Sequence, residues 1–174
     1  MSFEKFNAKI IKDMDKFIIK NLIILSLILG AILGLLEAVP FLGVLILLIA
    51  LLLTAPIVMV YLIMDGKLDL TTTKDSILTG ALTGFCANIS FSIAYSLIMV
   101  ILDKIFHYTP NFILTAMITH SPIWLLAVFV IFVGVLCATT NAFSGFATYY
   151  IINFIRDMYE QKHPNNDFNR NDYK

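Results

Sequence analysis

Hydrophobic residues along this chain gather into four long runs that polar or proline-containing breaks separate. The runs cover residues 22–39, 44–64, 76–102 and 123–155. A helix rises about 1.5 Å per residue, so each run with its flanks can cross a hydrocarbon core about 30 Å thick. Pro56 lies in the second run and lacks the backbone N–H, so we expect a kink in the final third of that helix. The pattern predicts an all-α fold, a four-helix transmembrane bundle over residues 21–155.

The first twenty residues follow a different pattern, in which lysines and apolar residues alternate at helical spacing. At about 100° per residue, five lysines fall on one face of a helix. They are Lys5, Lys9, Lys12, Lys16 and Lys20. This pattern is typical of an amphipathic helix that lies at the membrane interface with its lysines toward anionic headgroups. The alternative is a solvated helix that packs on a partner subunit.

The breaks between the runs differ in character. Pro40 and Gly43 predict a short hairpin between the first two runs. The polar loop 65–76 offers Thr73 or Asp75 as the cap of the next helix. Residues 103–122 have an apolar middle too short to span, which predicts an interfacial or re-entrant segment. The polar residues 156–174 predict a cytoplasmic tail, disordered beyond Pro164.

Composition and charge place the chain in a membrane and orient it there. Of the 174 residues, 59% are hydrophobic and 14% are charged, whereas soluble domains have more charge and fewer apolar residues. We therefore expect a multi-pass protein of the cell membrane. In a four-span topology Lys104 alone among the 12 lysines and arginines lies opposite the termini, so the positive-inside rule makes both termini cytoplasmic. A net charge of zero argues against a nucleic-acid partner.

Small residues recur in the third and fourth runs at intervals close to one helical turn. In lipid, helices associate through close backbone approach and interhelical hydrogen bonds, so such rows mark packing surfaces. The candidate packing residues are Gly80, Gly84, Gly134, Ala138 and Gly145. We expect these two helices to pack face to face, with the first span beside them. The second span, apolar nearly all round, is expected on the outside against lipid.

Polar side chains in the spans allow a second interpretation, a pathway for a small solute or ion between the third and fourth helices. Its candidate residues are Glu37, Thr83, Asn88, Ser92, Asn141, Ser144 and Thr148, with Glu37 at the outer mouth. Glu37 is the one ionisable residue within a predicted span, and such residues are functional candidates. Asn88 and Asn141 need partners in hydrocarbon. They either bond to each other or to nearby hydroxyls, or they line a wet cavity.

The sequence offers little for catalysis. Cys86 and Cys137 lie in apolar stretches without metal-ligand spacing, and we interpret both as small buried hydrophobes. His107 and His120, on the segment between the last two runs, form a metal or proton site or are merely solvated. We therefore expect no enzyme and no cofactor. The expected role is assembly or partner binding, as a homo-oligomer or a subunit of a membrane complex, and the alternative is a channel or transporter.

Two glycine-rich stretches carry a resemblance to a known group of proteins. "GAILGLLEAVPFLG" at residues 30–43 and "ILTGALTGFCA" at residues 77–87 resemble the small, uncharacterised four-span membrane proteins of archaea and bacteria. In these proteins a Gly-rich first helix, a turn with proline and a Gly-rich third helix recur. The resemblance covers roughly residues 22–102 and implies a four-span fold. It implies no activity and no functional residue.

Overall fold

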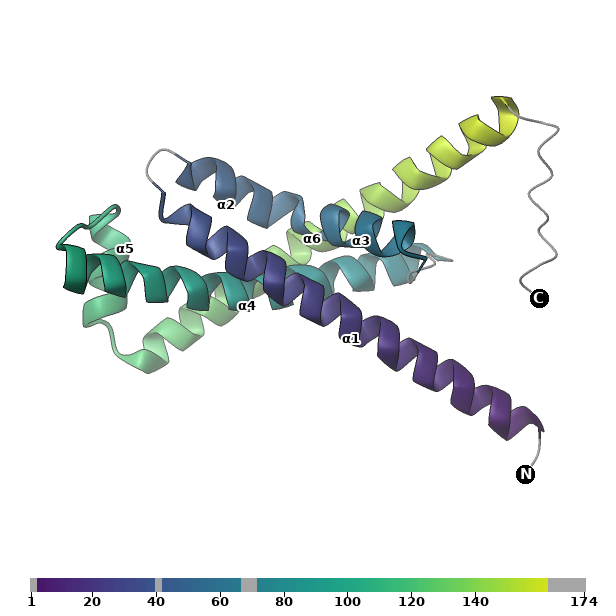
Figure 1. Cartoon of the computed structure of the whole chain (residues 1–174), viewed down its shortest axis with the longest axis horizontal. Coiled ribbons are helices and arrows are strands. Elements are labelled where there is room, and N and C mark those ends of the chain that lie inside the picture. Colours follow the sequence, from purple (N-terminus) through teal and green to yellow (C-terminus); the bar gives the residue numbers. More distant parts are fainter. Residues whose placement is uncertain (1–2, 40–41, 67–71, 163–174) are drawn as a thin grey trace.

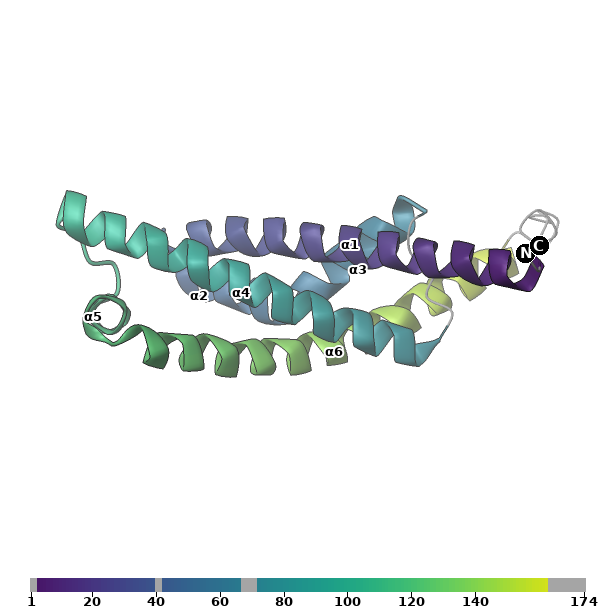
Figure 2. The ribbon, with the colours of Figure 1, turned by 90° about the horizontal axis from the view of Figure 1, so that it is seen from below.

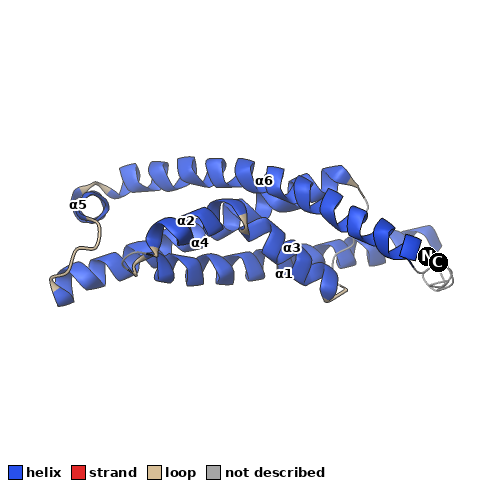
Figure 3. Ribbon diagram, turned by 90° about the horizontal axis from the view of Figure 1, so that it is seen from above, coloured by secondary structure: helices blue, strands red, loops and turns tan. Residues whose placement is uncertain are grey.

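The structure, a computed structural model, describes residues 3–39, 42–66 and 72–162. Within these ranges the chain forms six helices and no strand, as Figure 3 shows. The helices are α1 (Phe3–Glu37), α2 (Gly43–Leu52), α3 (Thr54–Met64), α4 (Thr73–Phe106), α5 (Phe112–His120) and α6 (Ile123–Lys162). The predicted all-α class is confirmed. Pro40 and the tail beyond residue 162 lie outside the described residues.

The predicted interfacial helix and the predicted first span form one helix. α1 runs from Phe3 to Glu37 without a break at residue 20, where we expected a boundary. The predicted polar tail likewise begins inside α6, which continues as helix to Lys162. A change from polar to apolar residues along a helix changes whether water or lipid solvates the side chains. It breaks no backbone hydrogen bond, so the helix can continue. Side chains are described from Ile18 onward, so four of the five lysines lie outside this description, and Lys20 is exposed.

The second apolar run contains a sharp bend. α2 and α3 meet at Leu53 with an angle of 57° between them. Pro56 has no N–H to donate, and its ring clashes with the carbonyl four residues earlier, that of Leu52. The bend therefore lies near the middle of the run and not in its final third as predicted.

The helices run back and forth along one long axis. α1 and α4 point the same way, whereas the bent α2–α3 pair and α6 return (Figure 1). The start of α1, the start of α4 and the end of α6 therefore lie toward one end of the molecule (Figure 2). The end of α1 and the start of α2 lie toward the other end. α5 lies there too, and it runs crosswise to α4 and α6. Figure 2 shows this, since α5 is seen end-on while α4 and α6 are seen from the side. α5 belongs to residues 103–122, for which we predicted an interfacial or re-entrant segment.

Within the described ranges, three helices are long and apolar enough to cross a membrane. Their spanning parts are Ile18–Glu37, Thr73–Phe106 and Ile123–Tyr159, and the bent α2–α3 pair makes a fourth if it counts as one broken span. Their outward faces are apolar, with Ile28 52% exposed and Phe132 61% exposed. Water-soluble monomers rarely expose continuous apolar surface of this kind.

α4 and α6 pack face to face along their small residues, as predicted. A Cβ atom on Gly84 would lie 2.5 Å from the Cys137 carbonyl oxygen, and one on Gly145 would lie 2.8 Å from the Ser76 carbonyl oxygen. Gly80 lies against the backbone of α6 in the same way, and Gly134 faces the Phe85 ring. A side chain at Gly80, Gly84 or Gly145 would separate the two backbones. The Ser76 hydroxyl adds a hydrogen bond of 2.6 Å to the Gly145 carbonyl.

α1 approaches α4 just as closely, which the sequence analysis did not predict. Gly30 lies against the Ala87 backbone, and Gly34 against the Phe91 backbone. The Ser90 hydroxyl donates to the Leu27 carbonyl at 2.7 Å. α4 is therefore held between α1 and α6 by small residues on both sides.

The second apolar run is not peripheral along its whole length, and the expectation that it lies outside is wrong for α3. Ala55, Val58 and Met59 have no exposed surface, and α3 contacts α1, α4 and α6. The start of α4 also differs in detail. Thr72, and not Thr73 or Asp75, is the N-cap, because its hydroxyl accepts from the Asp75 N–H at 3.2 Å.

We expect Gly84→Leu to lower the free energy of unfolding by about 1–3 kcal/mol, because the added side chain must displace the α6 backbone. The control is Ala127→Leu, which places the same leucine side chain at an exposed position on α6. Thermal unfolding in detergent measures both. Equal melting temperatures for the two variants would show that the α4–α6 contact is not tight.

Candidate functional site

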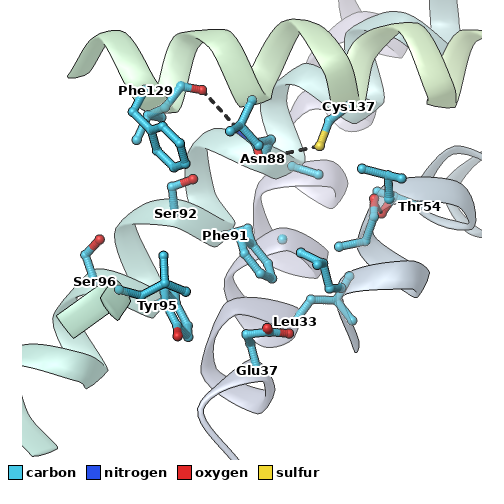
Figure 4. Close-up of a pocket in the computed structure, with 18 of the residues that line it drawn as sticks. Leu33, Glu37, Thr54, Asn88, Phe91, Ser92, Tyr95, Ser96, Phe129 and Cys137 are labelled. Carbon is cyan, nitrogen blue, oxygen red and sulfur yellow. Dashed lines mark hydrogen bonds between the residues drawn. The ribbon is translucent and has the colours of Figure 1, made fainter. Parts of the chain in front are cut away.

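A cavity of about 430 Å³ lies among the helices, and Figure 4 shows part of its lining. Residues from all six helices line it. The apolar wall contains Leu33 of α1, Leu47, Leu48 and Leu51 of α2, Phe91 of α4, Leu114, Met117 and Ile118 of α5, and Leu126, Phe129, Val130 and Val133 of α6. Most of the lining is apolar, and the size falls in the range of small-molecule sites, about 300–1,000 Å³.

A few polar groups interrupt this apolar wall. They are Glu37 at the end of α1, Thr54 at the start of α3, and Asn88, Ser92, Tyr95 and Ser96 along α4 (Figure 4). The polar residues of α4 recur at intervals of three or four, so they follow one face of that helix. Among the described residues that line the cavity, Glu37 is the only Asp, Glu, Lys, Arg or His.

Asn88 links α4 to α6 at the inner wall of the cavity. Its Nδ2 donates to the Val130 carbonyl at 3.2 Å, and the Cys137 thiol donates to its Oδ1 at 3.5 Å. The side chain is 6% exposed. Its partners are thus on α6, and Asn141 is not among those found. Cys137 is buried as predicted, but it also serves as a weak donor.

Asn141 lies inside the break between α2 and α3. In a continuous helix the Ala55 N–H would donate to the Leu51 carbonyl. Here the Asn141 Oδ1 accepts from the Ala55 N–H at 2.8 Å, and its Nδ2 donates to the Leu51 carbonyl at 2.9 Å. The carboxamide therefore takes the place of one backbone hydrogen bond. Asn141 has no exposed surface, so these bonds form in the protein interior.

Hydroxyl groups donate further hydrogen bonds to backbone carbonyls at the break. Thr140 donates to the Leu51 carbonyl at 2.9 Å, and Thr54 donates to the Ala50 carbonyl at 2.9 Å. Buried backbone groups without partners are costly, above all where water is absent. Thr140 and Asn141 of α6 thus supply the hydrogen bonds that the bend needs. Ala50, Leu51 and Thr54, at the bend, line the cavity.

The seven residues of the predicted pathway do not all line this cavity. Glu37, Asn88 and Ser92 line the cavity, whereas Thr83, Asn141, Ser144 and Thr148 do not. Ser144 and Thr148 donate within α6, to the carbonyls of Asn141 and Ser144. Thr83 is fully buried, and its hydroxyl has no hydrogen-bond partner among the described residues.

Glu37 lies where α1 ends and α2 begins. A Cβ atom on Gly43, the first residue of α2, would lie 3.3 Å from the Glu37 Oε1. The carboxyl group therefore lies at the N-terminal end of α2, where the helix dipole favours negative charge. The other oxygen, Oε2, is buried and has no hydrogen-bond partner within the described ranges.

The two histidines lie apart from this cavity lining. The ring Nδ1 of His120 lies 2.8 Å from the Thr119 hydroxyl, and His107 ends α4 in a left-handed backbone conformation with φ of 52°. Among the described residues, no group of three or more His, Cys, Asp and Glu side chains could hold a metal ion.

Comparison of the chain with known protein families, with characterised proteins and with solved structures gave no match. A function for this chain must therefore be inferred from the cavity and its chemistry.

We expect Asn141→Leu to lower the free energy of unfolding by about 1–3 kcal/mol, because the Ala55 N–H loses its partner in the interior. Thr139→Val is the matched control, since the Thr139 hydroxyl is exposed and donates only to Val135 of its own helix in the described structure. Thermal unfolding and amide hydrogen exchange of residues 50–58 measure the effect. Unchanged exchange at Ala55 would mean that Asn141 does not hold the break.

Proposed function

We propose that the chain is a four-span integral membrane protein with both termini in the cytoplasm. The bent α2–α3 pair serves as the broken second span in this topology. Three membrane-length helices, apolar outward faces and the shared end of the α1 start and the α6 end support it. The distribution of lysine and arginine supports the orientation, because Lys104 lies in the last turn of α4, and α4 ends at the same end of the molecule as α5 (Figure 2).

Cysteine labelling in cells tests this topology. In a background without Cys86 and Cys137, cysteines at Lys12 and Asn166 should react with an impermeant thiol reagent only after permeabilisation. A cysteine at His107 should react in intact cells. The reverse pattern would overturn the orientation, and reaction of Lys12 and Asn166 on opposite sides would overturn the four-span count.

We further propose that the protein is not an enzyme and that it binds an apolar small molecule in the cavity. The observation that carries this proposal is the cavity itself, about 430 Å³ with a mainly apolar wall and few polar groups. Such a site binds through apolar contact and orients its ligand with a few hydrogen-bonding groups. The ligand would enter from the bilayer, where apolar molecules concentrate.

Assembly with a partner, as a homo-oligomer or a subunit of a complex, is a separate proposal with less support. The glycine rows suggested it, but Gly80, Gly84 and Gly145 contact helices of the same chain. A polar pathway also has less support, because four of its seven residues do not line the cavity. Both are outcomes of the test that follows.

A neutral alkyl alcohol that carries a photoreactive diazirine tests the cavity. In liposomes it should label cavity residues such as Phe91 and Phe129 more than the exposed Ile151 of α6. Ser92→Phe should fill the cavity and reduce this labelling several-fold. Ile93→Phe, which adds a ring at an exposed neighbouring position, should not.

Equal labelling of Phe91 and Ile151 would contradict the cavity proposal. Flux of a polar solute into liposomes that Asn88→Leu abolishes would replace it with the pathway. Labelling that changes with the oligomeric state would favour the assembly role.

A further inference from the structure

We propose that the cavity selects an amphipathic amine, a molecule with one ammonium group and an apolar body, and that Glu37 is its counter-ion. This inference rests on the proposed ligand cavity and specifies the chemistry of its occupant. Its basis is the charge of the lining, the geometry of the Glu37 carboxyl group and the apolar character of the remaining wall.

The charge of the lining is one-sided. Lys, Arg and His are absent from the described residues that line the cavity, and Glu37 is the only acidic one. A carboxylate away from water is costly unless a cation or several donors pair with it. Because the chain brings no cation into this lining, a positively charged ligand complements it and an anionic one does not.

The carboxyl group of Glu37 lines the cavity and lies beside the start of α2. Its Oε1 would lie 3.3 Å from a Cβ atom on Gly43. Oε2 is buried and lacks a donor among the described residues. An ammonium group has three N–H donors and no acceptor, so it can form a charge-assisted hydrogen bond with a Glu37 oxygen that the side chain turns toward the cavity.

The rest of the wall accommodates an apolar body. The rings of Phe91 and Tyr95 lie stacked, with centroids 6.1 Å apart, on the α4 face that lines the cavity beside Glu37. Leucines of α2 and Phe129 of α6 continue the surface (Figure 4). A lipid with an amine in its headgroup also carries a phosphate, which would find no basic side chain in this lining. We therefore assign the site to a free amphipathic amine.

Two diazirine probes with the same chain, one ending in an ammonium group and one in a hydroxyl group, test the inference in liposomes. The amine should label Leu33 and Tyr95, beside Glu37, more than the alcohol does. Glu37→Gln keeps the shape of the side chain and removes its charge. It should reduce labelling by the amine about tenfold, the effect of losing one charge-assisted hydrogen bond. It should reduce labelling by the alcohol far less than labelling by the amine, and an unchanged melting temperature should show that the fold is intact.

The outcomes separate this inference from the proposed function. If alcohol and amine both label the cavity and Glu37→Gln changes neither, the cavity binds apolar molecules without charge selection and the inference is wrong. If neither probe labels the cavity, the proposed function fails as well. If phosphatidylethanolamine in the liposomes displaces the amine as well as an alkylamine does, a lipid headgroup is the occupant and the assignment to a free amine is wrong.

Discussion

The carboxamide of Asn141 is the contact on which the arrangement of this chain depends. It accepts from the Ala55 N–H and donates to the Leu51 carbonyl, and it thereby replaces one backbone hydrogen bond of the second apolar run. Pro56 makes a straight helix unfavourable here, but a bend in an apolar interior exposes backbone groups that need partners. Asn141 and Thr140 provide them from α6. The bend lets α3 bury itself among α1, α4 and α6, while α2 forms a wall of the cavity.

Close backbone approach supplies the rest of the framework. Gly84 brings α4 against α6, and Gly30 brings α1 against α4, so the backbones of three long helices approach closely at these glycines. Near α5 the facing residues are larger, such as Phe91 and Phe129, and the helices leave a cavity there. The same chain thus has a tightly packed part and an open part. Glu37 lies in the open part, where α1 ends, and therefore combines partial burial with access to a ligand.

The sequence predicted those features that depend on local pattern. Apolar length gave the helices, and the rows through Gly80, Gly84 and Gly145 predicted the α4–α6 contact. Pro56 indicated a break in the second run. The partner of Asn141 was not predictable, because it depends on which helix lies beside the break, and no spacing within α6 reports that. The cavity was missed because it depends on packing among six helices, although Asn88 and Ser92, which the sequence had indicated, lie on one of its walls. The spacing of four between Gly30 and Gly34 could have indicated the close contact of α1 with α4, but we did not predict that contact.

Native mass spectrometry of the protein released from lipid nanodiscs tests the central claim most directly, since it counts bound molecules. With a neutral alkyl alcohol present, the account predicts one tightly retained alcohol per chain for the natural sequence. It predicts none for the Ser92→Phe variant, provided that the variant keeps its melting transition. The same number of retained molecules in both proteins would contradict a ligand cavity formed around the bent α2–α3 pair.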